Sequence, residues 1–155
     1  MNHGPQNASR VERLLVFTRF PELGKTKTRL IPAFGDERAT AIAKLLVQNT
    51  IELASRFATE RGCDLTIYFS GGDCQLMASE FGRKLNFVEQ VDGDLGARLT
   101  RATEQEFSRG ARRVVVIGTD CHSLCESQLH LGFDALRSHD VVLGPATDGG
   151  YNSSA

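Results

Sequence analysis

The sequence lacks long hydrophobic runs. None approaches the ~18 consecutive apolar residues of a membrane-spanning helix, so we expect no membrane span. The first twelve residues, MNHGPQNASRVE, contain no apolar stretch, which argues against a secretory signal. An excess of either charge is also missing, because 18 Lys and Arg residues face 19 Asp and Glu residues for a net charge of -1. A dedicated nucleic-acid-binding domain is normally strongly basic. We therefore expect a cytoplasmic protein that binds no nucleic acid.

Closely paired cysteines are missing too. None of Cys63, Cys74, Cys121 and Cys125 has the C-x-x-C spacing of a zinc site or a thioredoxin-like dithiol. Cys121 and Cys125 would lie one turn apart on a shared helix, with His122 beside them, which leaves a metal site open as an alternative. Reduced, partly buried thiols are the interpretation that we favour.

Two glycine-rich phosphate-binding motifs are absent. Gly24-Lys25-Thr26 matches the end of a P-loop, but the full motif needs a glycine five positions before Gly24, where Arg19 stands. No G-x-G-x-x-G follows the first apolar segment, so the dinucleotide-binding fingerprint is missing as well. Lys25 and Lys27 remain candidates for phosphate contact as side-chain cations on a loop, with ordinary surface lysines as the alternative.

Apolar runs and helical patterns alternate along the whole chain. With 155 residues, 41% hydrophobic and 24% charged, the chain has the size and composition of one globular domain. Short apolar runs predict strands at 13–18, 64–70, 87–91, 113–117 and 140–143. Helical spacing predicts helices at 37–60, 74–81, 97–108 and 126–138, with Asp36 as an N-cap or first-turn acid. This alternation predicts a three-layer α/β/α domain with a mostly parallel sheet over residues 13–151, between tails at 1–12 and 152–155.

The loop after the first predicted strand is strongly basic. In open parallel sheets, ligands bind at the carboxyl ends of the strands, where the strand order reverses. Residues 19–31 form such a loop, with one acid and four cations: Glu22, Arg19, Lys25, Lys27 and Arg29. Because cations of this kind hold phosphate oxygens, the loop predicts a phosphorylated ligand.

Carboxylates follow the later strands. Asp120 comes after the strand at 113–117, Asp94 precedes the helix at 97–108, and Asp148 lies beside Gly149 and Gly150, which permit close backbone approach to a ligand. Carboxylate oxygens are the ligands that Mg²⁺ and Mn²⁺ prefer, so these acids predict a divalent metal beside the phosphates. The alternatives are a helix cap for Asp120, a turn aspartate for Asp148, and a chance grouping of solvated loop charges.

Four sequence blocks occur in order along the chain: RFPELGKTKTRL at 19–30, GDLGARL at 93–99, GTDC at 118–121 and GPATDGGY at 144–151. Together they resemble the bacterial DUF2064 family of GT-A-type glycosyltransferases, relatives of the nucleotide-diphospho-sugar transferases. The resemblance implies a nucleotide-diphospho-sugar transferase architecture, GT-A and Rossmann-like. Members of the family continue after the last block with further strands and helices, so we expect a C-terminally shortened form of that architecture.

The resemblance also implies roles for individual residues. Asp120 would bind the metal that bridges the diphosphate. Asp148, where the acceptor or a second metal contact is expected, would be the catalytic residue. The residues expected to bind substrate are Phe17, Thr18 and Arg19 beside the base and ribose, Lys27 and Arg29 beside the phosphates, and Lys25, Asp94, Gly118, Gly149 and Gly150.

The hypothesis is a metal-dependent glycosyltransferase domain, which uses a nucleotide-diphospho-sugar and Mg²⁺ or Mn²⁺ and transfers the sugar to an unknown acceptor. One alternative is a nucleotidyltransferase acting on a phosphorylated small molecule, since related guanylyltransferases also carry a Lys-Thr-Arg-Leu segment. A nucleotide-binding or partner domain without turnover is the other. A shortened sheet would expose an edge, which predicts a homodimer that covers the strand near Val141–Leu143.

Overall fold

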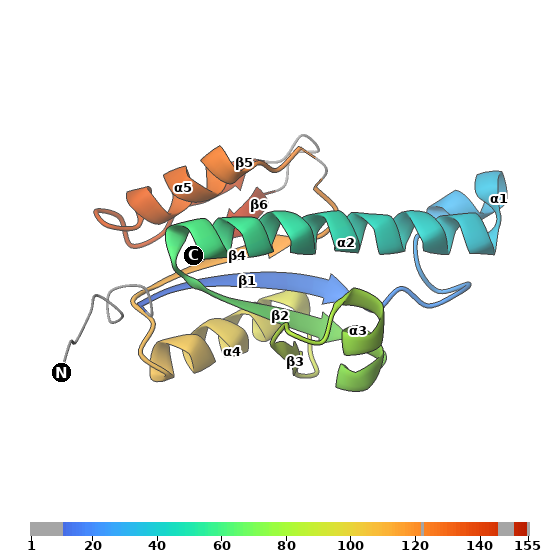
Figure 1. The fold of residues 1–155 in the computed structure, drawn as a ribbon, viewed down its shortest axis with the longest axis horizontal. Coiled ribbons are helices and arrows are strands. Elements are labelled where there is room, and N and C mark those ends of the chain that lie inside the picture. Colours follow the sequence, from blue (N-terminus) through green and yellow to red (C-terminus); the bar gives the residue numbers. More distant parts are fainter. Residues whose placement is uncertain (1–10, 122, 146–150, 155) are drawn as a thin grey trace.

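The computed structural model describes residues 11–121, 123–145 and 151–154, and the strands in these residues form one sheet. They are β1 (Glu12–Arg19), β2 (Asp64–Ser70), β3 (Phe87–Glu89), β4 (Arg113–Gly118), β5 (Gly144–Pro145) and β6 (Tyr151–Ser154). Their order across the sheet is β3-β2-β1-β4-β6-β5 (Figure 1). Strands β1 to β4 run parallel, whereas β6 is antiparallel to both of its neighbours.

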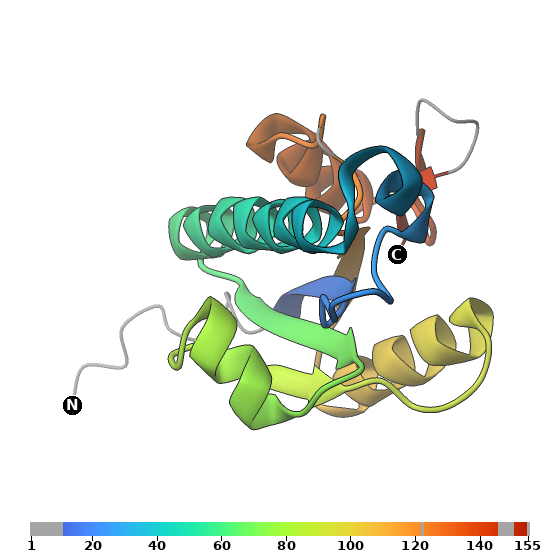
Figure 2. The same cartoon turned by 90° about the vertical axis from the view of Figure 1, so that its right-hand side faces the viewer.

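Helices cover both faces of this sheet. They are α1 (Ile31–Phe34), α2 (Asp36–Arg61), α3 (Cys74–Phe81), α4 (Leu95–Ser108) and α5 (Glu126–Ala135), with a 3-10 turn (Thr28–Leu30) before α1. Helices α2, α3 and α5 pack on one face and α4 packs on the other, as Figures 1 and 2 show. The predicted three-layer domain with a mostly parallel sheet is therefore confirmed. Among the described residues, no helix is both long and apolar enough to cross a membrane.

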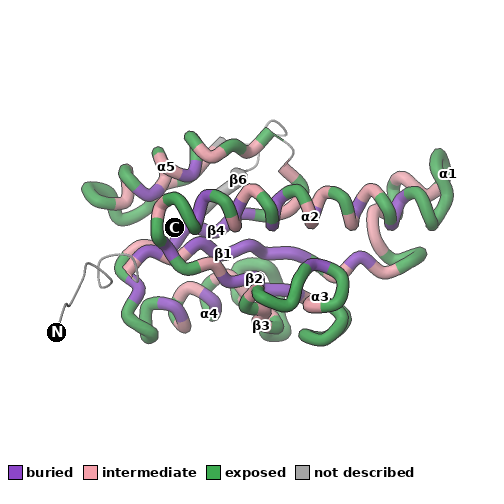
Figure 3. The backbone as a smooth tube through the Cα atoms, in the orientation of Figure 1, coloured by how far each residue is buried: buried purple, intermediate pink, exposed green. Residues whose placement is uncertain are grey.

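The central strand β1 contributes to both halves of the core. Leu14 and Val16 pack among the residues of α2, α3 and α5, while Leu15 and Phe17 pack among those of α4. Successive side chains of a strand point to opposite faces, so a strand covered on both sides is apolar throughout. Figure 3 shows this burial along β1, with exposed positions on the outer helix surfaces.

The sequence pattern predicted several boundaries closely. Strand β2 and helix α3 have the predicted bounds, and α2 extends one residue beyond its predicted range at each end. Asp36 lies in the first turn of α2, where its negative charge is favourable, and Gly35 is the N-cap. Gly62 ends the same helix with a φ of +75°, in the left-handed conformation that glycine adopts easily.

The C-terminal part of the sheet differs from the prediction. Residues 140–143 form no strand, whereas Gly144–Pro145 forms β5 and residues 152–154, predicted as a tail, belong to β6. Strand β6 pairs with the edge of β4 that faces away from β1. This edge is therefore already occupied, and residues 140–143 do not pair with it. Val141 and Leu143 are accordingly 60% and 49% exposed. Helix α5 also ends earlier than predicted, at Ala135 rather than Ser138.

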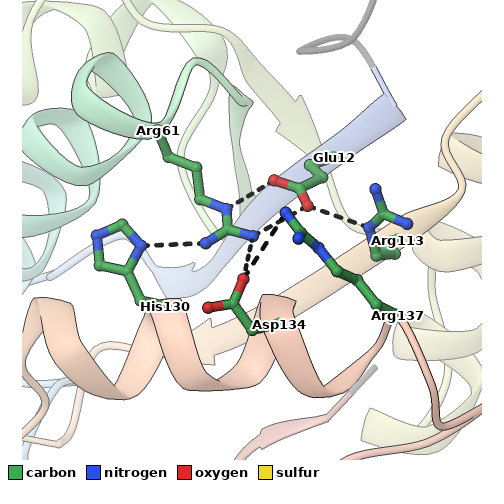
Figure 4. A network of polar contacts seen from close by, with 6 residues as sticks. All are labelled: Glu12, Arg61, Arg113, His130, Asp134 and Arg137. Atoms are coloured by element: carbon green, nitrogen blue, oxygen red, sulfur yellow. Dashed lines mark hydrogen bonds and ion pairs between the residues drawn. The ribbon is translucent and has the colours of Figure 1, made fainter.

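A network of charges joins the helices to the amino ends of the strands (Figure 4). Arg61, at the end of α2, donates to both carboxylate oxygens of Glu12 in β1, over 2.7 and 3.1 Å. The same guanidinium donates to Asp134 of α5 and lies 3.0 Å from Nδ1 of His130. Arg113 of β4 donates to Glu12 over 3.1 Å. The network therefore holds α2, α5, β1 and β4 together at the end of the sheet opposite the carboxyl ends of β1 and β4.

Candidate functional site

A cavity of about 530 Å³ lies at the carboxyl ends of β1, β2 and β4. The helix α2 that follows β1 covers one face of the sheet, and the helix α4 that precedes β4 covers the other. The strand order thus reverses between the adjacent strands β1 and β4, where ligands bind in open α/β sheets. The cavity is lined by Phe17, Thr18, Arg19, Lys25, Thr26, Lys27, Ala43, Leu46, Val47, Ser70, Gln90, Leu95, Arg98, Gly118, Thr119 and Asp120.

The ends of β1 and β4 form the floor of this cavity. Phe17, Thr18 and Gly118, all predicted to bind substrate, line it. The hydroxyl oxygens of Thr18 and Thr119 lie 3.2 Å apart, in hydrogen-bonding contact between the two strand ends. Because the strands are buried and paired, this floor is a rigid base for the more exposed side chains around it.

The basic loop contributes three of its four cations to the cavity. Arg19, Lys25 and Lys27 line it, whereas Arg29 is exposed in the 3-10 turn and does not. Lys25 lies 2.9 Å from the carboxylate of Glu22 and holds the pKa of that carboxyl below its ordinary value. The backbone N–H of Glu22 donates to the hydroxyl of Thr26 over 2.9 Å, so the loop is also bonded to itself.

Lys27 joins the basic loop to the segment that follows β4. Its Nζ donates to Oδ1 of Asp120 over 2.6 Å. Lys27 has a φ of +53°, in the left-handed region, and is the one non-glycine residue with positive φ in the part of the chain described here. Such conformations are costly for residues with a Cβ and cluster at functional sites. The backbone at Lys27 is thus held in a form that places its ammonium on Asp120.

Asp120 has the exposure expected of a ligand-binding carboxylate. Its side chain is 82% exposed, and α5 begins only at Glu126 with Cys125 as its N-cap, so Asp120 does not cap that helix. Within the described residues, no group of three or more His, Cys, Asp and Glu side chains is arranged to hold a metal. In many nucleotide sites Mg²⁺ is held by one or two carboxylates together with substrate phosphates. The residues present therefore fit a divalent cation only as part of a joint site with a phosphorylated ligand.

Other predicted site residues lie elsewhere. Asp94 is the N-cap of α4: its Oδ1 accepts from the backbone N–H of Ala97 over 2.8 Å, and it does not line the cavity. Asp148, Gly149 and Gly150 lie outside the described residues.

The alternative of a metal site at Cys121, His122 and Cys125 required the two cysteines to lie on one helix, and they do not. Cys125 is the N-cap of α5 and Cys121 lies in the preceding loop, so the two do not share a helix. His122, the third member of the group, lies outside the described residues. All four cysteines are free thiols. The expectation of partly buried thiols holds for Cys121 and, with deeper burial, for Cys63, whereas Cys74 and Cys125 are exposed.

Gln90 and Arg98 were not predicted from the sequence. The side-chain amide of Gln90 donates to the backbone carbonyls of Thr18 and Tyr68, over 3.1 and 2.9 Å, and so links the ends of β1 and β2. Arg98 donates from Nε to the carbonyl of Gly93 over 2.8 Å. Arg98 lies within the GDLGARL block, which was the available signal, while a lone glutamine after a short strand carries none.

A second cavity of about 280 Å³ adjoins the first. Four residues line both: Arg19, Ser70, Gln90 and Arg98. The smaller cavity is completed by Gly71, Glu89, Val91 and Asp92. The site therefore has two compartments that share a boundary of two arginines and two neutral polar side chains.

Comparison with known proteins bears on this architecture. The model of the DUF2064 family, described as "Uncharacterized protein conserved in bacteria", matches residues 52–153. A solved structure from Desulfovibrio desulfuricans G20, described as a "putative nucleotide-diphospho-sugar transferase", is 30% identical in sequence and has a TM-score of 0.85. The match covers 94% of this chain but 62% of that one, so the chain spans less than two thirds of this relative's length. A search of curated proteins finds no match.

Proposed function

The chain belongs to the DUF2064 family, as its sequence blocks predicted, and from its fold and cavity we propose that it binds a nucleotide-diphospho-sugar and transfers the sugar to an acceptor. The observation that carries the proposal is the cavity where the strand order reverses, which is lined by four cations and by Asp120. The similarity to the solved structure described as a "putative nucleotide-diphospho-sugar transferase" supports the choice of ligand.

In this proposal the floor of the cavity and the cations around it, Arg19, Lys25, Lys27 and Arg98, which form its rim, bind different parts of the ligand. The ends of β1 and β4 position the nucleotide, with Phe17 and Thr18 beside the base and ribose. The cations of the rim hold the diphosphate and stabilise the negative charge that builds on the departing nucleoside diphosphate. Asp148 is proposed as the catalytic residue on the acceptor side and as a second metal contact.

Metal dependence is also part of the proposal. Asp120 would hold Mg²⁺ or Mn²⁺ together with the ligand phosphates, and the cation would supply further neutralisation of the leaving group. Lys27 already contacts Oδ1 of Asp120 over 2.6 Å, and we propose that it releases this oxygen when a cation binds there. Lys27 is then free to contact a phosphate.

The first experiment is a thermal-shift screen of nucleoside diphosphates and nucleotide sugars, each with and without Mn²⁺. A ligand that binds only the folded protein adds about 2.7 kcal/mol of stability at a hundredfold excess over its Kd. For a chain of this length that raises the Tm by about 5 to 10 °C. A screen in which no nucleotide raises the Tm, with or without metal, would show that the proposed ligand is wrong.

Asp120→Asn tests the metal. We expect the variant to bind the nucleoside diphosphate in metal-free buffer at least as tightly as the wild type, because a negative charge near the phosphates is gone. The increase in affinity that Mn²⁺ gives the wild type should be lost. Isothermal titration with and without Mn²⁺ measures both quantities. An unchanged Mn²⁺ effect in the variant would exclude Asp120 as a metal ligand.

The products separate the three hypotheses. Sugar transfer or slow hydrolysis releases a nucleoside diphosphate from a nucleotide sugar. A nucleotidyltransferase instead releases pyrophosphate from a nucleoside triphosphate and a phosphorylated small molecule. Chromatography of both mixtures distinguishes the reactions. Binding without either product would support a nucleotide-binding domain without turnover.

We also propose that the protein forms a homodimer through the segment 140–143. The segment forms no strand, but its apolar side chains Val141 and Leu143 are largely exposed, and such residues favour association. Light scattering over a range of concentrations should give a dimer mass that Val141→Glu reduces. A monomer mass for the wild type at all concentrations would refute the proposal.

A further inference from the structure

The four cations of the larger cavity fall into two classes. Lys25 lies 2.9 Å from Glu22 and Lys27 lies 2.6 Å from Asp120, so both lysines are paired with a carboxylate. Within the described residues, neither Arg19 nor Arg98 forms an ion pair. Among the described residues, the cavity cations with no carboxylate within ion-pair distance are therefore Arg19 and Arg98, whereas Lys27 becomes available only when a metal replaces it on Asp120.

Arg98 is held in place without being neutralised. Its Nε donates to the carbonyl of Gly93 over 2.8 Å, and Nη1 makes a longer contact of 3.4 Å with Oε1 of Gln90. Gln90 is itself fixed, because its amide nitrogen donates to two backbone carbonyls. Both partners of Arg98 are uncharged, so the guanidinium is oriented by its neighbours while its charge stays uncompensated by them.

Two arginines elsewhere in the chain whose side chains are largely buried are each paired with a carboxylate. Arg13 lies 2.6 Å from Asp64, and Arg61 lies 2.7 Å from Glu12. Removing a cation from water is unfavourable unless a carboxylate or a set of hydrogen bonds replaces the water. Arg98 is partly removed from water and lines two cavities, yet has no carboxylate partner among the described residues. An anionic group of a ligand would supply that partner.

The positions of Arg19 and Arg98 indicate which chemical group of the ligand they bind. Arg19 and Arg98 both line both cavities, so they lie at the boundary between the two compartments. Glu89 and Asp92 in the smaller cavity are not within ion-pair distance of either arginine. A guanidinium presents two parallel N–H donors, which match two oxygens of one phosphate.

We propose that Arg98, together with Arg19, binds a phosphate group of the ligand at the boundary of the two cavities. Arg98 is then the principal phosphate-binding residue, in place of Arg29, which lies outside the cavity, while Lys25 and Lys27 have carboxylate partners. The proposal rests on the proposed function for the identity of the ligand as a nucleoside diphosphate. Gln90 acts as a positioning residue, because it contacts Arg98 and the strand ends.

The test compares Arg98→Gln and Arg98→Lys with Arg101→Gln, a matched charge loss at an exposed position one turn along the same helix that lines neither cavity. Isothermal titration uses three probes: inorganic pyrophosphate, the nucleoside diphosphate that stabilises the wild type most, and the corresponding nucleoside. A hydrogen bond to a charged group contributes about 1.5 to 3 kcal/mol, so Arg98→Gln should weaken diphosphate binding roughly 10- to 150-fold.

The variants should separate phosphate binding from structural support. Binding of the nucleoside should not change in Arg98→Gln, and Arg98→Lys should recover part of the loss, since lysine keeps the charge but not the paired donors. Arg101→Gln should match the wild type with all probes. Diphosphate binding by Arg98→Gln equal to the wild type overturns the proposal, and so does an equal loss of nucleoside binding, which would assign Arg98 to the base or ribose.

Two further outcomes separate this inference from the proposed function. Wild-type protein that binds pyrophosphate in an Arg98-dependent way, but none of the nucleoside diphosphates, supports the phosphate site and refutes the proposed ligand. Malonate, added as a carboxylate probe, should bind much more weakly than pyrophosphate. Equal, Arg98-dependent binding of malonate would overturn the assignment to phosphate in favour of a carboxylate.

Discussion

Glu12→Gln should destabilise the protein far more than Asp134→Asn, although both carboxylates bind the same guanidinium. Glu12 accepts from Nε and Nη2 of Arg61 over 2.7 and 3.1 Å, and Asp134 accepts from Nη2 over 2.9 Å (Figure 4). The difference lies in burial. The side chains of Glu12 and Arg61 are both 10% exposed, whereas that of Asp134 is 55% exposed.

The two costs follow from this difference. Removing one partner of a buried ion pair costs about 3 to 5 kcal/mol, and here the loss of Glu12 leaves Arg61 with the exposed Asp134 as its counterion. Removing an exposed partner costs about 0.2 to 1 kcal/mol, because water replaces it. For a chain of this length, Glu12→Gln should lower the Tm by roughly 6 to 20 °C, and Asp134→Asn by no more than about 4 °C.

The acid dependence of stability gives a second measure. Burial of Glu12 favours its neutral form, but the bonds from Arg61 and Arg113 outweigh burial and hold its pKa below the ordinary value of 4.5. The contribution of Glu12 to stability is therefore complete above pH 4.5 and is lost as the pH falls through the lower pKa of the folded state. The difference between wild type and Glu12→Gln should shrink over the same range.

Urea denaturation of the two variants and the wild type, from neutral pH to about pH 3, measures both effects. Equal losses for Glu12→Gln and Asp134→Asn at neutral pH would refute the reasoning, because burial would then not determine the cost. A difference between wild type and Glu12→Gln that stays constant down to pH 3 would refute the pKa argument alone.

Two further predictions concern the other buried groups. Tyr68→Phe should lower the free energy of unfolding by about 1 to 3 kcal/mol, because the buried carboxylate of Glu106, which is 2% exposed, loses the hydroxyl that donates to it over 2.7 Å. Urea denaturation measures this change, and an unchanged free energy of unfolding would contradict the prediction. Burial raises the pKa of the Cys63 thiol to about 11, whereas a hydrogen bond with Ser127 lowers the pKa of the exposed Cys125 thiol. Alkylation of the folded protein should therefore modify Cys125 well before Cys63, which mass spectrometry measures. The reverse order would contradict this prediction.

Local patterns in the sequence predicted the bounds of those elements whose own side chains fill the core. The apolar run in β2 and the helical spacing in α3 predicted both sets of bounds, because each pattern records which side chains are buried. The run at 140–143 has the same composition as a strand and was wrongly predicted to be one. An apolar run forms a strand only where a neighbouring strand is open to pair with it. The outer edge of β4 is already paired with β6.

The candidate site was predictable where charge follows a strand directly. Arg19 is the last residue of β1 and Asp120 follows the end of β4 by two residues, and the rule that ligands bind at the carboxyl ends of parallel strands places them together. Arg29 is only ten residues from Arg19, yet the 3-10 turn directs it out of the cavity. Position along a loop does not predict side-chain direction, since loop conformation depends on contacts made elsewhere.

The order of residues along this chain was enough to predict an α/β domain of the DUF2064 family and a basic loop beside Asp120, since periodicity and short motifs are local properties. Which cations are available to a ligand was decided by tertiary structure. Lys25 and Arg98 carry the same charge, but folding brings Glu22 to the first and only neutral acceptors, Gly93 and Gln90, to the second among the described residues. Pairing of charges depends on distances across the fold, and no spacing in the sequence encodes them.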